Sequence, residues 1–345
     1  MLDGFWYIAA ESRLVRPGRL TATALANQAI VLVRNRSGAV QALEDRCAHR
    51  GVPLSSGRLD GESIQCPYHG WRFSTSGTCL EAPVLGAGTA PKSACVRSYP
   101  VQEQDGWVWV YMGNERCSIP VIPPQAFPAP ADGSAISLLR MSMPVKSRME
   151  FAVDNFIDPA HVPFVHAGIF RQRKAQRLKE KEFTRLPQGF RTVSTNVLLP
   201  NTIVFRAVTP TLAPAKTTVD FLMPGIHLET FEVGARWGAI MVVVTPLTEH
   251  STRLDFTMGW NFLRGVFPLV WLARLIGGIV LRQDRRIIEL QEQGHRHKNT
   301  MNLSLDSDRL AVWYRQLQKY HLDQLAGASN LQHPVPEKVT LRWVT

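Results

Sequence analysis

The sequence predicts an α+β protein of two domains: a small all-β domain, then a larger domain that combines helices with an antiparallel sheet. Three observations lead to this fold class. A chain of 345 residues is too long for one minimal core. Its first 115 residues or so contain short strand-like runs separated by Gly and Pro. The rest mixes strands and helices without strand–helix–strand alternation, which argues against a parallel sheet.

Two hairpins are predicted in the N-terminal part. Residues 29–34 (AIVLVR) and 40–43 flank a short polar turn. Residues 99–104 and 107–112 are joined by an Asp-Gly dipeptide, which is typical of a two-residue hairpin turn. A further turn is expected at residues 74–77. Short strands joined by tight turns favour an all-β domain.

A proline-dense stretch, IPVIPPQAFPAPADG, follows these strands. Proline removes backbone donors and favours extended chain, so this stretch is expected to separate the two domains. We therefore predict an N-terminal domain over residues 1–120, a linker over 121–134, and a second domain over 135–320. Residues 321–345 are interrupted by Gly and Pro and are expected to form a loosely packed tail.

The second domain is predicted to contain two helical segments, around residues 149–165 and over roughly residues 269–293. Between them lie runs rich in β-branched and aromatic residues, which indicate strands. These runs cover residues 192–199, 202–208, 217–221, 239–245 and 252–260.

Charge and composition exclude several classes of protein. The apolar fraction of 45% is that of a globular rather than a disordered chain. The net charge of +11 is concentrated after residue 130, most densely at residues 171–185. This run indicates a solvated face or a docking surface for an acidic electron-transfer partner. No helix-turn-helix, zinc-finger or RNA-binding pattern is present, so nucleic acid is not expected as a partner.

The amino terminus lacks the basic start and long apolar core of a secretion signal. The most apolar stretch, residues 262–281, contains Arg264, Pro268 and Arg274, so a buried helix is expected and membrane contact is at most peripheral. Five cysteines are too few and odd in number for a disulfide scaffold. We therefore expect a cytoplasmic protein in a reducing compartment, where paired Cys and His indicate metal binding.

The first candidate metal site has the pattern C-x-H-x16-C-x2-H, formed by Cys47, His49, Cys66 and His69. Two thiolates and two imidazoles are the ligands of either a structural zinc site or a Rieske [2Fe–2S] cluster. The C-x-H spacing differs from that of zinc fingers, and both pairs lie on loops of a β-rich domain. The flanking segments HRGVPLSSG and CPYHGWRF also resemble Rieske loops. The pattern thus favours the cluster over zinc.

The second candidate site has the pattern N-x2-D-x2-H-x4-H, formed by Asn155, Asp158, His161 and His166. On a regular helix the two His side chains would be about 140° apart, since each residue turns about 100°. They can reach one ion only if the helix is distorted between them. Pro163 offers a reason for such a distortion, because proline lacks an N–H and clashes with the preceding turn.

Two imidazoles need an anionic partner to form the two-His-one-carboxylate triad that leaves positions on iron open. Asp284, on the long predicted helix, is the candidate for this third ligand. Glu289, on the same helix, and Asp154 are the alternatives. A carboxylate in such an Arg-rich helix otherwise indicates a surface ion pair.

Together, the segments CAHRGVPLSSGRLDGESIQCPYHGWRF and DNFIDPAHVPFVHAG resemble the α-subunits of Rieske non-haem iron oxygenases. The resemblance is closest to the short α-only monooxygenases, namely vanillate and dicamba O-demethylases and saxitoxin-pathway oxygenases. The segments QDRRIIELQ and SDRLAVWYR are also similar to these members. The resemblance implies a Rieske domain followed by a helix-grip-like catalytic domain, assembled as a homotrimer. The chain lacks the CxxC of pheophorbide a oxygenases, which speaks against that particular function.

The resemblance also implies roles for the residues that match the motifs. It assigns the [2Fe–2S] cluster to Cys47, His49, Cys66 and His69, and a mononuclear Fe(II) to His161, His166 and Asp284. Asp158 matches the carboxylate that links a cluster His of one subunit to an iron His of its neighbour. Asn155 matches a supporting position near the iron.

The implied activity uses O2 and electrons from NAD(P)H, supplied through a ferredoxin or a flavin/iron-sulfur reductase. The expected reaction is hydroxylation or oxidative demethylation of an aromatic or polycyclic small molecule. A ring cis-dihydroxylating dioxygenase is the alternative enzyme, and a zinc-stapled binding protein is the alternative without catalysis. Six residues of the second domain are candidates for core or substrate pocket: Phe205, Phe221, Met223, His227, Trp237 and Trp260.

Overall fold

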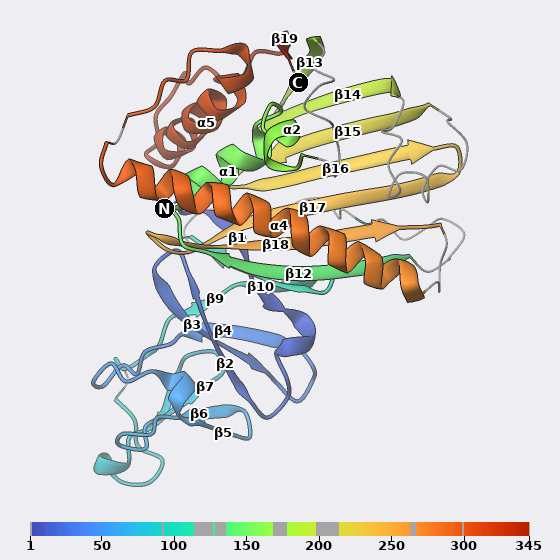
Figure 1. The fold of residues 1–345 in the computed structure, drawn as a ribbon. Helices are drawn as coiled ribbons and strands as arrows, with labels where there is room; N and C mark the ends of the chain where they lie inside the picture. Colours follow the sequence, from blue (N-terminus) through green and yellow to red (C-terminus); the bar gives the residue numbers. More distant parts are fainter. Residues whose placement is uncertain are drawn as a thin grey trace. The chain divides into compact units, whose positions relative to one another are not determined.

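β-Strands form the N-terminal part of the computed structural model (Figure 1). Their residues are either continuously buried or alternately buried and exposed. The structure describes residues 2–91, 93–113, 127, 136–167, 178–197, 214–262, 267–298 and 300–344. The chain forms two compact units. Residues Asp3–Gln125 with Thr245–Glu249 form the first, and Leu2, Ala126–Val244 and His250–Thr345 the second. We call these the N-terminal unit and the C-terminal unit. The predicted linker, residues 121–134, lies outside the described residues except for Phe127.

The N-terminal unit contains three small sheets, with strand orders β1-β11-β10, β2-β3-β4-β9 and β5-β6-β7-β8. The strands are β1 (Phe5–Glu11), β2 (Leu20–Leu25), β3 (Gln28–Arg34), β4 (Val40–Glu44), β5 (Arg58–Asp60), β6 (Ser63–Gln65), β7 (Arg72–Ser74), β8 (Cys79–Glu81), β9 (Ser98–Tyr99), β10 (Val101–Gln104) and β11 (Trp107–Met112). Short 3-10 turns are η1 (Ser12–Leu14), η2 (Leu54–Ser56) and η3 (Pro83–Leu85).

Both predicted hairpins are confirmed. β3 and β4 pair antiparallel and close at Arg34 opposite Val40. β10 and β11 are joined by Asp105 and Gly106, whose φ angles of 53° and 76° are the positive values that a type I′ turn requires. The Asp-Gly dipeptide therefore forms the two-residue hairpin turn that was predicted from it.

An eight-stranded sheet forms the C-terminal unit, in the order β12-β18-β17-β16-β15-β14-β13-β19. Pairing is antiparallel at β12–β18 and from β17 through to β19. The predicted α+β class with an antiparallel sheet is thus confirmed. The strands are β12 (Ser137–Val145), β13 (Leu178–Leu186), β14 (Gly189–Val197), β15 (Ala215–Leu222), β16 (Ile226–Val233), β17 (Arg236–Thr248), β18 (Ser251–Trp260) and β19 (Lys338–Val344).

Among the described residues of this unit, the helices are α1 (Met149–Ile157), α2 (Val162–Val165), α4 (Phe267–His295) and α5 (Arg309–Leu325), with a 3-10 turn η4 (Asp306–Asp308). Helices α1, α2 and α4 lie over one face of the sheet (Figure 1). The contact is close: a Cβ added to Gly225 would come within 2.7 Å of Met149 Cε on α1. A Cβ added to Gly277 on α4 would come within 2.7 Å of Met141 Cε on β12. Glycine at these two positions lets the helices approach the sheet.

The helix predicted over residues 149–165 is interrupted, and the interpretation of Pro163 was wrong. α1 ends at Ile157, and Asp158 is extended, with ψ 115°. A residue that precedes a proline disfavours helical backbone angles. Pro159 therefore explains why the helix ends before Asp158. Pro163 lies in the first turn of α2, where its missing N–H removes no helical hydrogen bond. The break directs the chain to His161 before α2 begins.

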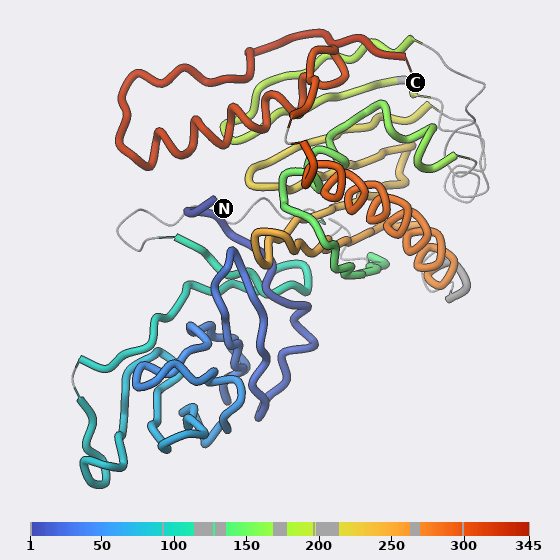
Figure 2. Tube along the Cα trace, turned by 60° about the vertical axis from the view of Figure 1, so that its left-hand side comes forward, coloured from blue at the N-terminus to red at the C-terminus, as the bar shows by residue number. Residues whose placement is uncertain are grey.

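The expectation of a loosely packed C-terminal tail was also wrong for its last strand. Residues up to Leu325 complete α5, and β19 pairs antiparallel with β13 along the edge of the sheet (Figure 2). Leu341 and Trp343 alternate with exposed residues and are buried. Sequence analysis also missed β12, β13 and β16, while its predicted strand at 202–208 lies outside the described residues.

The long helix predicted over residues 269–293 is confirmed as α4. Among the helices of the described residues, none combines the length and apolarity that crossing a membrane would need.

Candidate metal centres

Two loops of the N-terminal unit carry the first group of candidate ligands, and they have the same local design. In one loop the Gly51 N–H donates to the Cys47 carbonyl oxygen at 2.9 Å; in the other the Gly70 N–H donates to the Cys66 carbonyl oxygen at 3.2 Å. Both glycines have positive φ, 74° and 72°, which residues with a side chain rarely adopt. Each C-x-H or C-x2-H pair is therefore displayed on a tight, hydrogen-bonded loop.

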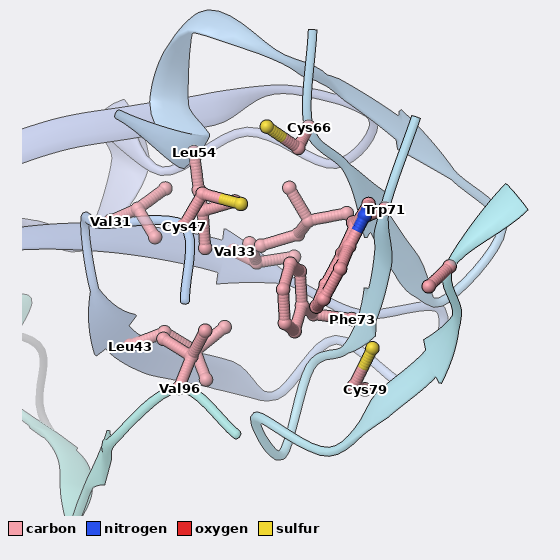
Figure 3. Close-up of a cluster of buried hydrophobic side chains, with 12 residues drawn as sticks. Val31, Val33, Leu43, Cys47, Leu54, Cys66, Trp71, Phe73, Cys79 and Val96 are labelled. Carbon is pink, nitrogen blue, oxygen red and sulfur yellow. The ribbon is translucent and has the colours of Figure 1, made fainter. Parts of the chain in front are cut away.

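The two thiols lie together at one end of the buried cluster that includes Leu54 and Phe73 (Figure 3). Cys47 and Cys66 are 2% and 3% exposed. Burial, with the neighbouring Cys66 thiol, raises the pKa of Cys47, so this thiol holds its proton until a cation replaces it. A pair of buried thiols in one cluster fits one iron of a mixed-ligand cluster.

The two imidazoles lie at the surface of the same site. The ring centroids of His49 and His69 are 4.7 Å apart, and the Trp71 indole stacks on His49 at 4.7 Å with an interplanar angle of 8°. Desolvation, with the nearby His69 and Arg50, lowers the pKa of His49 and favours the neutral ring that a metal binds. Two buried thiols and two exposed imidazoles match the donor set of a Rieske cluster.

The second group of ligands converges from three segments of the C-terminal unit. His161 follows the break after α1, His166 follows α2, and Asp284 lies in α4. The Nε2 atoms of His161 and His166 lie 3.7 Å and 3.0 Å from Asp284 Oδ1. One ligand atom from each residue falls within 4.8 Å of the others. The structure thus brings together the three side chains that the sequence analysis singled out.

Three hydrogen bonds orient these ligands. Asn155 Nδ2 donates to Asp284 Oδ1 at 3.0 Å. His161 Nδ1 lies 2.8 Å from the Asp158 carbonyl oxygen, and His166 Nδ1 lies 2.9 Å from Gln283 Oε1. Both rings are therefore held through Nδ1, which leaves Nε2 for a metal. Sequence analysis missed Gln283, because nothing in its local pattern distinguishes it from a surface glutamine.

The carboxylate and the backbone carbonyl of Asp158 have different partners. Its carbonyl contacts the His161 ring, but its carboxylate Oδ1 accepts the Ala160 N–H at 2.7 Å. Burial raises the pKa of Asp158, against the effect of that N–H and of His161. Within the described chain, Asp158 supports the turn that presents His161 and is not itself one of the grouped ligands.

The alternative carboxylates are engaged elsewhere. Asp154 holds Arg315 of α5 through two contacts of 2.8 Å and 2.6 Å. Glu289 accepts Arg285 Nε at 2.9 Å and the Lys146 N–H at 3.1 Å. Neither belongs to the group formed by Asp284 and the two histidines.

A second buried carboxylate on α4, missed by the sequence analysis, anchors this helix. Glu292 is 2% exposed and accepts Arg148 Nε at 3.1 Å and the Arg148 N–H at 3.0 Å, directly before α1. Its other oxygen lies 3.0 Å from His250 Nδ1. Despite the opposing effect of burial, the hydrogen bonds from Arg148 and His250 lower the pKa of Glu292 to about 2. This contact fixes α4, which carries Asp284, against α1.

Comparison with protein families defines the class of protein. The Rieske [2Fe-2S] domain model matches residues 5–100, and the vanillate O-demethylase oxygenase C-terminal domain model matches residues 145–324. The second match covers more than half of the chain. The chain therefore belongs to the Rieske oxygenases of the vanillate O-demethylase type, and the predicted family resemblance is confirmed.

Individual relatives are longer than this chain. Chlorophyllide a oxygenase of Oryza sativa subsp. japonica is 34% identical over 326 residues, covering 91% of this chain and 56% of the relative. The toluene-4-sulfonate monooxygenase iron-sulfur subunit TsaM1 of Comamonas testosteroni is 33% identical over 180 residues, covering 50% of this chain and 49% of the relative. The chain thus spans about half the length of these curated relatives.

Solved structures share the fold over nearly the whole chain. Dicamba monooxygenase bound to 3,6-dichlorosalicylic acid superposes with a TM-score of 0.79 at 24% identity, covering 94% of this chain and 98% of the other. NdmA of Pseudomonas putida CBB5 with theobromine gives 0.76 at 21% identity, covering 94% and 92%. These likenesses show that the chain shares the fold of these proteins.

Proposed function

We propose that the protein is the oxygenase component of a Rieske monooxygenase. It hydroxylates or oxidatively demethylates an aromatic or polycyclic small molecule, using O2 and electrons from NAD(P)H. The observation that carries this proposal is the group of His161, His166 and Asp284. Two imidazoles and one carboxylate occupy one side of an iron and leave positions open for O2, a property that a closed structural metal site lacks.

The residues that would hold the two groups are those of the described sites. Cys47, Cys66, His49 and His69 would hold the [2Fe–2S] cluster, and His161, His166 and Asp284 the Fe(II). When bound, these groups supply one-electron transfer and O2 activation.

The supporting residues keep the ligands in position. Asn155 orients the Asp284 carboxylate, and the Asp158 carbonyl fixes the tautomer of His161. The Asp158 carboxylate is proposed to link the cluster of one subunit with the iron ligand of the next, in a homotrimer. This proposed link is supported by the match of Asp158 to the linking carboxylate in the family motif.

An electron-transfer partner is part of the proposal. His49 and His69 are exposed, so electrons can enter at the imidazole side of the site. The chain has 39 Lys and Arg against 28 Asp and Glu. Such a positive surface suits an acidic ferredoxin or a flavin/iron-sulfur reductase.

The proposed substrate class follows the named relatives. They include a toluene-4-sulfonate monooxygenase subunit, a chlorophyllide a oxygenase and a 3-chlorobenzoate-3,4-dioxygenase subunit. Aromatic rings or fused ring systems are common to these names. We therefore propose an aromatic or polycyclic substrate that carries a methyl or methoxyl group.

The test is turnover under 18O2 with NADH and an added reductase, across a panel of methoxylated and methylated aromatics. For a methoxyl substrate, O2, NADH and a proton should yield the phenol, formaldehyde, water and NAD+, with one substrate oxidised per NADH. Substrate-dependent formation of formaldehyde with matching O2 and NADH consumption, or label in a hydroxylated product, supports the proposal; formaldehyde itself exchanges its oxygen with water. An iron- and sulfide-loaded protein that consumes no O2 with any panel member contradicts it. A cis-diol with two labelled oxygens would instead identify a ring dioxygenase.

A further inference from the structure

His227 lies on the sheet face that carries α1. In the register of the sheet it is opposite Phe221 on β15 and Val242 on β17, so the three side chains form a row on the same face. Gly225, two residues earlier, points to this face as well, because a Cβ there would meet Met149 and Val153 of α1. His227 therefore faces the side of the sheet over which the iron-ligand segments run.

The His227 side chain is half-buried on this face, and one of its ring nitrogens is shielded from solvent. Its Nδ1 atom is shielded from solvent and makes no hydrogen bond within the part of the chain that the structure describes. Its neighbours in the row, Phe221 and Val242, are buried and apolar. A shielded ring nitrogen left unpaired is costly, so a ligand that offered it a donor or an acceptor would relieve that cost.

One ring of the triad acts electrostatically on His227. Burial lowers the pKa of His227 to about 4, and the His161 ring contributes to the same shift. His227 is thus a neutral imidazole at neutral pH, with one N–H to donate and one nitrogen to accept. It offers hydrogen bonding without a positive charge.

We propose that His227 is a substrate-contacting, specificity-determining residue, which hydrogen-bonds an uncharged oxygen on an otherwise apolar aromatic molecule. A phenolic hydroxyl or a carbonyl fits a neutral imidazole flanked by Phe221 and Val242, whereas a carboxylate would lack a compensating charge there. The inference rests on the proposed function only in calling the bound molecule a substrate.

The experiment measures binding, without O2 or reductant, of two probes that differ by one hydroxyl: 4-methoxyphenol and anisole. Isothermal titration calorimetry is carried out on the metal-loaded full chain and on His227→Phe and His227→Gln. The matched control is Trp343→Phe, which removes a buried ring N–H that has no hydrogen-bond partner among the described residues and lies four strands away at the sheet edge. Iron content and circular dichroism verify that each variant is folded.

We expect the unsubstituted protein to bind 4-methoxyphenol about tenfold more tightly than anisole, the usual effect of one hydrogen bond. His227→Phe should lose this preference while anisole affinity stays within about twofold; His227→Gln should keep part of it. Equal affinities in the unsubstituted protein, or a preference that survives in His227→Phe, would overturn the proposal. Because no turnover is measured, a protein that never oxygenates but shows the preference would contradict the proposed function and leave His227 as a ligand-binding residue.

Discussion

In the N-terminal unit, four candidate ligands come from two short loops, each closed by its own backbone hydrogen bonds around Gly51 and Gly70. In the C-terminal unit, the ligands come from segments far apart in the sequence and are held by side chains of other elements. The first group ends in two exposed imidazoles, whereas His166 and Asp284 are 3% and 2% exposed. One centre is built from local sequence, and the other from tertiary packing.

This difference has a physical consequence. A tight loop can position its ligands even if distant contacts change, because its geometry is set by residues within a few positions. The triad depends on how α4 packs on α1, and that packing is fixed by Glu292 with Arg148 before α1. Substitutions distant from any ligand should therefore disturb the second centre and leave the first intact.

The largest expected effect comes from removing a ligand of the packed centre. Asp284→Ala should lose about one of three irons per chain and keep the inorganic sulfide, since the cluster ligands lie on other loops. Substrate-dependent O2 uptake should fall at least about 100-fold. Iron, sulfide and O2 assays on the purified protein measure this. The control is Glu289→Gln on the same helix, which alters an ion pair with Arg285.

The reciprocal test removes a ligand of the N-terminal centre and compares what each substitution does to the other centre. Cys66→Ser should lose the sulfide and about two irons and keep the third. If Asp284→Ala retained all of its iron, or if Cys66→Ser emptied both centres, the two sites would not be independent in the way that their construction implies.

Asp158→Ala is expected to have the next largest effect. Both metal loads should persist, because the carboxylate accepts the Ala160 N–H and is not one of the grouped ligands. Turnover should fall by about 100-fold if this carboxylate lies on the electron path. Asp158→Asn separates the two roles, since an amide oxygen can still accept the Ala160 N–H but carries no charge. Cluster reoxidation in a single turnover should be slow in both variants, and normal reoxidation in Asp158→Asn would reduce Asp158 to a turn-forming residue.

Glu292→Gln tests whether a contact away from the ligands affects only the packed centre. Loss of the charge weakens the contacts with Arg148 and His250 and should lower the unfolding free energy by about 2–3 kcal/mol. This loss is smaller than that from breaking a fully buried ion pair, because Arg148 is partly exposed. Urea unfolding followed by tryptophan fluorescence measures this cost. Iron in the triad should bind more weakly, while the visible spectrum of the cluster stays unchanged.

The same variant has a pH dependence with a defined sign. The folded pKa of Glu292 is lowered to about 2, from an ordinary value of 4.5. Its contribution is therefore fully present above about pH 4.5 and is lost as the pH falls toward 2. The stability difference between the unsubstituted protein and Glu292→Gln should shrink between about pH 4.5 and pH 2. A difference that stayed constant over this range would mean that the carboxylate charge is not the stabilising feature.

The same contrast explains how much could be predicted from the sequence. The C-x-H and C-x2-H pairs, the Asp-Gly hairpin and the long helix were found from local patterns, because their causes are local. The grouping of Asp284 with His161 and His166 depended on family resemblance, since an Asp in an Arg-rich helix otherwise indicates a surface ion pair. The distortion predicted between His161 and His166 was wrong, because the chain is helical between them and the break lies before both, at Asp158 and Pro159.

Other features had no local signal. β19 was missed because its residues follow a Gly- and Pro-containing stretch, and their pairing partner β13 lies more than a hundred residues earlier. Glu292 and Gln283 look like ordinary helix-surface residues until α4 packs beside the start of α1 and the end of α2. Tertiary contacts determine both outcomes, so a single sequence shows neither.

The smallest effect is expected at the locally built centre. Trp71→Phe keeps an aromatic ring against His49 and removes an Nε1–H that has no hydrogen-bond partner among the described residues. Since no hydrogen bond of the described chain is lost, unfolding free energy should change by less than about 1 kcal/mol, with sulfide content unchanged. The reduced EPR spectrum and the midpoint potential of the cluster should stay close to those of the unsubstituted protein. A potential that falls clearly in Trp71→Phe, at full sulfide content, would show that the indole N–H acts on the cluster and that this centre also depends on more than its loops.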